Sequence, residues 1–490
     1  MSGNDLDRSL VSGIGWTALA RWSSQAISWV AILYAARFLQ PADYGLVGLA
    51  MLPIGLLRLI EDFGFDAVLV QNRKLARDDI ARLGGLTLVI ATCLTGLIVI
   101  AAPWLANLLS KPDDPQRALL PMVIAVASAM LIFDALQVVP RALLQRELRF
   151  KALAGVHLTQ VAVTSLVLVT IARSGNGHWA LVFNNLGGAL AATILLFVLS
   201  PILLRWPSGL GRLKHTLLQG WRMLVSRGSW YAYSNADSTA IGRFLGTDAL
   251  GNYQFAQTFS NTAVQEVTAL ITRVVPGIFS SAQHDPAVLR RYFLLLTEAL
   301  AYVAFPMCAG VALTADVLVM AALGPQWTGV IEPLRALCLY SAFVVAQILA
   351  SHVLLWTGRF RANMWLSMLA LVVLPAAAVI GAQHDVTTVA WALAIGYPIA
   401  SFPGLMLARR AIAMPWLDYV RALLPATLGC AVMAAVVLMV RAGITGNMGP
   451  LSALAVQATA GALTYVTVLA LFYRDRLRVL YQLVRQQQTS

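Results

Sequence analysis

The sequence predicts an all-helical protein that crosses a membrane about 14 times. Apolar segments of roughly 20 residues, the length that spans a hydrocarbon core, follow one another from about residue 14 to residue 473. The composition agrees, because 59% of the 490 residues are hydrophobic, only 12% are charged and the mean hydropathy is +0.74. These values exclude a water-soluble protein of this length.

The expected spans are apolar runs separated by Gly and Pro residues. Breakers such as Gly324 and Pro325 mark the turns between them. The connections are short, the longest being the basic segment around residues 205–222, so the chain has no room for a catalytic domain outside the membrane. We expect helices at about residues 16–38, 45–70, 83–109, 118–140, 152–172, 178–204, 224–245, 250–280, 292–323, 330–356, 362–381, 387–408, 418–441 and 450–473.

Positive charges mark one side of these helices. About 25 of the 35 Lys and Arg residues fall in the even-numbered connections or in the C-terminal tail. By the positive-inside rule, both termini should be cytoplasmic and the number of spans even. The net charge of +13 is spread over these loops, which favours contact with anionic lipids over nucleic acid. Residues 1–13 are polar and no cleavage site follows, so the first helix is expected to be its own insertion signal.

An internal repeat organises the helices. Residues 36–45 read ARFLQPADYG, and residues 242–251, six helices later, read GRFLGTDALG. An even number of intervening helices gives both copies the same orientation, so we expect two six-helix lobes related by a pseudo-twofold axis along the membrane normal, with two helices added at the C-terminus. The alternative is a common helix-end pattern. The expected parts are an N-lobe at 1–204, a basic cytoplasmic linker at 205–223, a C-lobe at 224–411, and helices 13 and 14 with a cytoplasmic tail at 412–490.

The first copy of the repeat and the residues after it resemble a known family. Residues 36–45 are followed by EDFGFDAVLVQ at 61–71, which is similar to the N-terminal signature of Wzx-type polysaccharide flippases, and most similar to the WzxC-like branch. The second copy, extended to Tyr253, also resembles that branch. These flippases belong to the multidrug/oligosaccharidyl-lipid/polysaccharide (MOP) exporter superfamily.

The resemblance implies a transporter rather than an enzyme. Its expected substrate is an undecaprenyl-pyrophosphate-linked oligosaccharide, moved from the cytoplasmic to the periplasmic leaflet of a bacterial inner membrane for exopolysaccharide synthesis. Membrane lipids are expected partners, and the resemblance suggests a polysaccharide polymerase and a chain-length regulator as further ones. Two alternatives are a lipid II flippase and a drug/cation antiporter of the same superfamily. The signature around Asp43 to Gln71 argues against the first, and the expected extra pair of helices argues against the second.

Such a substrate needs a wet and partly cationic cavity, because its diphosphate and hydroxyl groups cannot enter hydrocarbon unpaired. Ionisable residues within the spans are the candidates, since a charge at the bilayer centre is costly and usually faces the protein interior. Arginine is suited to phosphate because its planar guanidinium stays charged and donates in a fork. The candidate cations are Arg21, Arg58 and Arg273, and the candidate coupling or cavity carboxylates are Glu61, Asp62, Asp66, Asp134, Asp237 and Glu266.

Each charge also has a structural alternative. Arg58 and Asp62 are four residues apart on one helical face and could neutralise each other. Arg21 could extend to the cytoplasmic interface. Asp134 and Asp237 have no cation near them in the sequence, which leaves protonation or an interhelical partner.

The seventh expected helix is unusually polar. Trp230, Tyr231, Tyr233 and Asn235 lie within a few residues of one another, and such a stretch should line a cavity rather than face lipid. Aromatic rings beside amide and hydroxyl groups suit a sugar, while hydrogen bonding between helices is the alternative. No metal or cofactor is expected, because the six histidines and four cysteines have no metal-ligand spacing, and the cysteines are expected to be buried small hydrophobic residues.

Overall fold

The computed structural model describes residues 22–62, 77–202, 204–206, 228, 230–282, 285–444, 448–474 and 476, and every regular element in these ranges is a helix. The chain forms two compact units, Met1–Gly251 and Asn252–Ser490. The boundary falls inside helix α11 (Thr247–Ala282). The all-helical fold that the sequence predicts is confirmed.

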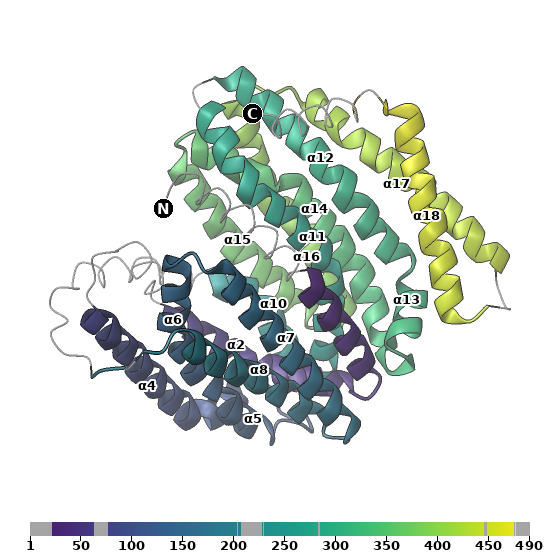
Figure 1. The fold of residues 1–490 in the computed structure, drawn as a ribbon. Helices are drawn as coiled ribbons and strands as arrows, with labels where there is room; N and C mark the ends of the chain where they lie inside the picture. Colours follow the sequence, from purple (N-terminus) through teal and green to yellow (C-terminus); the bar gives the residue numbers. More distant parts are fainter. Residues whose placement is uncertain are drawn as a thin grey trace. The chain divides into compact units, whose positions relative to one another are not determined.

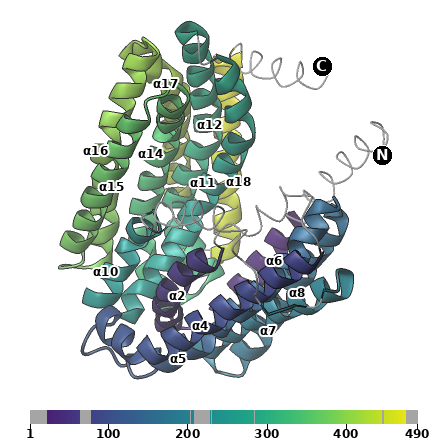
Figure 2. The ribbon, with the colours of Figure 1, turned by 90° about the vertical axis from the view of Figure 1, so that its left-hand side faces the viewer.

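The first unit is a bundle in which helices distant in sequence lie side by side. Helix α2 packs against α5, α8 and α10, while α4 packs against α6. Helices α7 and α8 form an adjacent pair, as Figure 2 shows. The bounds are α2 (Pro41–Asp62), α4 (Arg77–Leu109), α5 (Leu120–Ala127), α6 (Ala129–Arg146), α7 (Phe150–Arg173), α8 (Gly177–Leu199) and α10 (Ala236–Phe244) (Figure 1).

The second unit is built in the same way. Helix α14 lies between α12 and α16, α15 packs on α16, and α17 packs on both α12 and α18. The bounds are α12 (Pro286–Leu313), α13 (Ala315–Ala322), the short 3₁₀ helix η2 (Pro325–Val330), α14 (Ile331–Trp356), α15 (Phe360–Gly381), α16 (Val386–Ala411), α17 (Trp416–Ile444) and α18 (Pro450–Phe472).

Eleven helical segments in the described part of the chain are long and apolar enough to cross a membrane. Each corresponds to a span that the sequence predicts. Of the other three expected spans, the first and the seventh are only partly within the described residues, and the eighth corresponds to α11. The protein is therefore a multi-pass membrane protein.

The outer faces of these helices are apolar. Val372 on α15 is 67% exposed and Leu463 on α18 is 69% exposed. Such side chains are stable against lipid tails, and the helices satisfy their own backbone hydrogen bonds, as a bilayer requires. Inside the second unit, a core around Phe279, Phe293 and Val353 is fully buried.

Two expected spans that lie wholly within the described residues are interrupted, which the sequence did not predict. The span at 118–140 is divided at Ser128 into α5 and α6, and the one at 292–323 is divided at Thr314 into α12 and α13. At each break a side-chain hydroxyl donates to a backbone carbonyl: Ser128 Oγ to Ala125 O at 2.7 Å, and Thr314 Oγ1 to Gly310 O at 2.8 Å. Such bonds compete with regular helix hydrogen bonding.

The start of α16 provides a test of the fold outside the membrane-spanning segments. Asp385 is its N-cap, and Oδ1 accepts a hydrogen bond from the Thr388 backbone N at 2.7 Å. The Asp385→Ala variant should lose about 1 kcal/mol of stability, measured by thermal unfolding in detergent, because an amide donor of the first turn loses its partner. The Asp385→Asn variant keeps an acceptor and should lose less; an equal loss in both would contradict a capping role.

The same cap should make stability depend on pH. Hydrogen bonds from Thr388 lower the pKa of Asp385 below its ordinary value. Because the folded-state pKa is the lower one, the stabilisation is present above a pH of about 4 and is lost as the pH falls through the folded-state value.

Candidate functional site

The first unit holds an ion pair between two of its membrane-spanning segments. Arg58 lies near the end of α2, and its Nε donates to Asp134 Oδ2 on α6 at 2.7 Å, while its Nη2 contacts the same oxygen. Both side chains remain accessible, at 44% and 27% exposure. Asp134 therefore has an interhelical partner, which was one of the two alternatives from sequence.

This pairing differs from the alternative that the sequence offered, a pair of Arg58 with Asp62 on one face of α2. The guanidinium of Arg58 reaches across to α6. Sequence distance was a poor guide because helix packing brings together residues that are 76 positions apart. The side chain of Asp62 lies outside the described residues.

A second arginine, Arg141, lies one residue beyond the expected span at 118–140 and joins this pair. Asp134, Gln137 and Arg141 are spaced i, i+3 and i+7, so they share one face of α6. Arg141 Nη2 donates to Gln137 Oε1 at 2.8 Å, and Arg141 acts electrostatically on Asp134. The helical spacing from Asp134 is the signal that could have identified both residues.

Buried hydrogen bonds hold this stripe in place. Gln137 is 3% exposed, and its Nε2 donates to Ala189 O and to Thr193 Oγ1 on α8, each at 3.1 Å. With its amide donor occupied in this way, the Gln137 oxygen is oriented toward Arg141. We call Arg58, Asp134, Gln137 and Arg141 the charged stripe.

The charged stripe carries a net positive charge. Two guanidiniums accompany one carboxylate, so the sum is +1 within segments that are otherwise apolar enough to span a membrane. Ionisable residues within membrane-spanning segments often mark substrate pathways. The arrangement is suited to an anion, because each guanidinium can donate several hydrogen bonds to phosphate or carboxylate oxygens.

The polar seventh helix lies against α2 close to the stripe. The Tyr231 hydroxyl donates to Leu52 O at 3.0 Å, and it lies within electrostatic range of Arg58. A Cβ at Gly55 would overlap the Tyr231 hydroxyl, so the glycine makes room for this contact. Tyr231 therefore makes the hydrogen bond between helices that was the alternative to a role in sugar binding.

The same helix is broken rather than continuous, which corrects the expected span at 224–245. Asn235 has φ −118° and ψ 10° and precedes α10, and its Nδ2 donates to Tyr231 O at 2.9 Å. Asp237, in the first turn of α10, is 9% exposed, and its Oδ1 accepts from Ser238 N at 2.7 Å. Trp230 is 57% exposed and Tyr233 is half-buried.

Several predicted site residues fall outside what the structure describes. Arg21 and Asp66 are not described at all, and for four others only the helix is described. Glu61 and Asp62 belong to α2, and Glu266 and Arg273 to α11, without described side chains.

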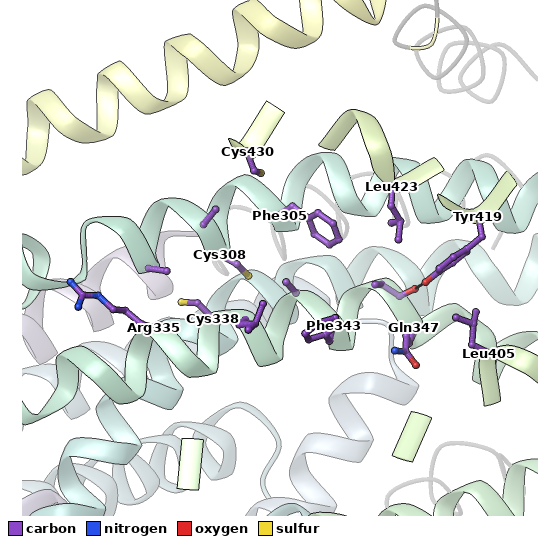
Figure 3. A pocket seen from close by; sticks show the side chains of 15 residues that line it. Phe305, Cys308, Arg335, Cys338, Phe343, Gln347, Leu405, Tyr419, Leu423 and Cys430 are labelled. Carbon is purple, nitrogen blue, oxygen red and sulfur yellow. Dashed lines mark hydrogen bonds between the residues drawn. The ribbon is translucent and has the colours of Figure 1, made fainter. Parts of the chain in front are cut away.

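The second unit contains an elongated cavity of about 440 Å³ between α12, α14 and α17 (Figure 3). Arg335 lies at one end and Tyr419 at the other, and most of the lining is apolar. Arg335 is already paired with Glu332 and lies 3.8 Å from Asp316. Few side chains in this cavity could form hydrogen bonds to a hydroxyl-rich ligand.

Three of the four cysteines line this cavity. Cys308 and Cys338 are buried, as expected, and Cys430 is half-buried. Cys93 is exposed on α4, so the expectation of burial is wrong for it. Its position on an apolar helix explains the difference, because hydrophobic side chains on the outside of a span face lipid.

Comparison with known proteins assigns the chain to a family. Residues 34–332 match the family described as "Polysaccharide biosynthesis protein". The teichuronic acid biosynthesis protein TuaB of Bacillus subtilis is 25% identical over 372 residues, 72% of each chain. The lipopolysaccharide biosynthesis protein WzxC of Escherichia coli is 22% identical over 343 residues, 68% of this chain and 67% of WzxC.

The fold also matches a solved transporter. The lipid II flippase MurJ, in an inward closed conformation, aligns with a TM-score of 0.74 at 13% identity, covering 94% of this chain and 99% of MurJ. This likeness shows a shared fold. The family match covers more than half of the 490 residues. The chain is therefore a member of the polysaccharide biosynthesis protein family.

Proposed function

We propose that this protein moves undecaprenyl-pyrophosphate-linked oligosaccharide repeat units across the bacterial inner membrane for exopolysaccharide synthesis. The observation that carries the proposal is the charged stripe, a hydrogen-bonded cluster of net charge +1 within apolar helices. A diphosphate of about two negative charges is the part of this substrate that hydrocarbon excludes most strongly. Family membership and the names of TuaB and WzxC support a polysaccharide precursor as the cargo.

In this proposal the parts of the substrate contact different groups. Arg58 and Arg141 bind the diphosphate, with Gln137 positioning Arg141. Trp230, Tyr233 and Asn235 contact the sugars, because aromatic rings stack on sugar C–H faces and amides bind hydroxyls. Trp230 is exposed and Tyr233 is half-buried. Arg21 and Arg273 stay candidates for a second diphosphate contact, and Glu61, Asp66, Asp237 and Glu266 for coupling.

Transport would follow alternating access of the two lobes, with about 14 helices in total and both termini in the cytoplasm. Membrane lipids, a polysaccharide polymerase and a chain-length regulator would be its partners. Membership of a polysaccharide biosynthesis family favours this cargo over lipid II. The similarity to the lipid II flippase MurJ concerns the fold alone and does not favour lipid II. A drug/cation antiporter would need no paired guanidiniums.

Deletion of the gene tests the function directly. In a strain without a second flippase, surface polysaccharide should fall at least about tenfold, while lipid-linked repeat units accumulate and stay inaccessible to a sugar-binding reagent applied outside. The amount of lipid-linked repeat units and their accessibility can be measured in spheroplasts, and surface polysaccharide can be measured on intact cells. A plasmid copy of the gene should return each value to that of the wild type. Normal surface polysaccharide in the deletion strain would overturn the proposal.

A further inference from the structure

The cavity of the second unit is polar only at its ends. Among its described lining residues, Arg335, Gln347 and Tyr419 are those whose side chains carry nitrogen or oxygen. Arg335 lies at one end and the other two lie toward the opposite end (Figure 3). The Tyr419 hydroxyl already donates to Ala346 O at 2.8 Å. The middle of the cavity therefore offers a ligand only apolar groups and thiols.

The dimensions of the cavity fit a single hydrocarbon chain. Arg335 and Gln347 are 12 positions apart on α14, which is about 18 Å of helix at about 1.5 Å per residue. This length is close to one leaflet of a hydrocarbon core, which is about half of 30 Å. The volume of about 440 Å³ over that length gives a mean cross-section of about 24 Å². Such a width admits one chain rather than two, because non-bonded carbon atoms pack about 3.5–4.0 Å apart.

The cavity is open beside one of its lining residues. Leu339 on α14 lines it and is 42% exposed, whereas Cys308 and Cys338, which also line it, are buried. A chain that enters beside Leu339 can therefore lie against the two buried thiols. Its carbon atoms would gain dispersion contacts with the cavity wall that an empty space does not provide.

Four charged side chains gather at the Arg335 end, where α13 and α14 begin and α17 ends. Arg335 pairs with Glu332 and lies 3.8 Å from Asp316, and Arg441 contacts both carboxylate oxygens of Asp316. All four side chains stay accessible, at 25–54% exposure. Two guanidiniums accompany two carboxylates, so their charges sum to zero. We call Asp316, Glu332, Arg335 and Arg441 the end cluster.

The end cluster is complementary to a headgroup that carries both signs of charge. The guanidiniums of Arg335 and Arg441 can donate to phosphate oxygens, and the carboxylate of Glu332, which is 54% exposed, can accept from an ammonium. A purely anionic headgroup would face the two carboxylates as well as the two arginines. A cluster of zero net charge gives it no overall attraction.

We propose that the cavity and the end cluster together bind one molecule of phosphatidylethanolamine. One acyl chain fills the cavity past Cys308 and Cys338, while the phosphate and the ammonium lie on the end cluster. The lipid is a resident ligand of the second unit and not the cargo, since the charged stripe belongs to the first unit. The inference therefore does not depend on the proposed transport function.

The native cysteines can report whether the cavity is occupied. In the purified full-length protein, delipidated in detergent, phosphatidylethanolamine should slow the reaction of Cys308 and Cys338 with N-ethylmaleimide at least about fivefold, because the chain covers their sulfur atoms. Peptide mass spectrometry measures each site separately. Cys93, which is exposed on α4 in the first unit, is the internal control and should react at an unchanged rate. Equal rates with and without the lipid at Cys308 and Cys338 would overturn the proposal.

Two other lipids distinguish the occupant. Phosphatidylglycerol has an anionic headgroup, and undecaprenyl diphosphate represents the proposed cargo. At equal concentration each should protect the thiols of Cys308 and Cys338 at least about fivefold less than phosphatidylethanolamine, because neither presents an ammonium to Glu332. Stronger protection by either lipid would overturn the assignment to a zwitterionic phospholipid.

The Glu332→Gln variant tests the end cluster. It removes the charge that the ammonium would contact and leaves the cluster at +1, so the preference should reverse in favour of phosphatidylglycerol. An unchanged preference in the folded variant would contradict the assignment of the headgroup.

A filled cavity tests the acyl chain. Ala342→Phe places a ring among the lining residues and should reduce bound phosphatidylethanolamine at least about tenfold, counted by native mass spectrometry. The matched control is Val372→Phe on α15, where the replaced side chain is 67% exposed and binding should not change. Unchanged binding in a folded Ala342→Phe protein would overturn the proposal. If this variant does not fold, thiol protection in the wild type and the lipid preference of Glu332→Gln decide the question.

Discussion

Replacing Arg58 by alanine should reduce transport at least about thirtyfold, because Arg58 has two electrostatic roles. It contributes one of the two guanidiniums of the charged stripe, and it also neutralises Asp134. Its loss lowers the net charge of the stripe from +1 to zero and leaves a carboxylate within an apolar segment. Truncation of one partner in a buried charge pair costs about 2–5 kcal/mol. Because Arg58 and Asp134 are partly exposed, we take the lower end of this range, and 2 kcal/mol corresponds to about thirtyfold.

The measurement is flipping of lipid-linked oligosaccharide in vesicles, with the amount of each variant checked in the membrane. Arg58→Lys should retain part of the activity, since it keeps the charge but loses the two-donor fork. The matched control is Arg205→Ala, which breaks the ion pair with Asp78, where both side chains are more than half exposed. Exposed pairs contribute little, so transport should change less than about twofold. Wild-type flipping by Arg58→Ala would remove the stripe from the substrate path.

The spans could be predicted because a membrane imposes a length on each apolar run. Helix α15 (Phe360–Gly381) was expected at 362–381, and α18 (Pro450–Phe472) at 450–473. The breaks at Ser128 and Thr314 could not, because no Gly or Pro marks them. At each break a hydroxyl group donates a hydrogen bond to a backbone carbonyl of the same helix. Because isolated Ser and Thr residues also occur in unbroken helices, these residues alone do not predict a break.

Only part of the charged stripe could be predicted from the sequence. Arg58 and Asp134 stand out as charges in apolar runs, but their pairing depends on how α2 packs against α6, which no local pattern encodes. Arg141 was missed because loop charges and cavity charges look alike near the end of a helix. Only Gln137 distinguishes them, since it fixes the guanidinium on the face that carries Asp134.

Replacing Asp134 by asparagine should separate binding from turnover. Asp134 is paired with Arg58 and interacts electrostatically with Arg141, so we expect it to compete with the diphosphate for these two guanidiniums. Asparagine preserves the shape and one acceptor but removes the charge, which raises the net charge of the stripe from +1 to +2. Undecaprenyl diphosphate should therefore bind more tightly to Asp134→Asn and leave more slowly.

The expected gain follows from the lost repulsion. Two unit charges 4 Å apart interact by about 4 kcal/mol at an effective dielectric constant of 20, and solvent reduces this because Asp134 is 27% exposed. We expect about tenfold tighter binding of undecaprenyl diphosphate to the purified protein, with flipping reduced by a similar factor because release is slowed. A purely structural ion pair would behave differently, since the asparagine variant would then lose stability and bind no more tightly. Weaker or unchanged binding in a folded Asp134→Asn protein would show that the carboxylate does not compete with the substrate.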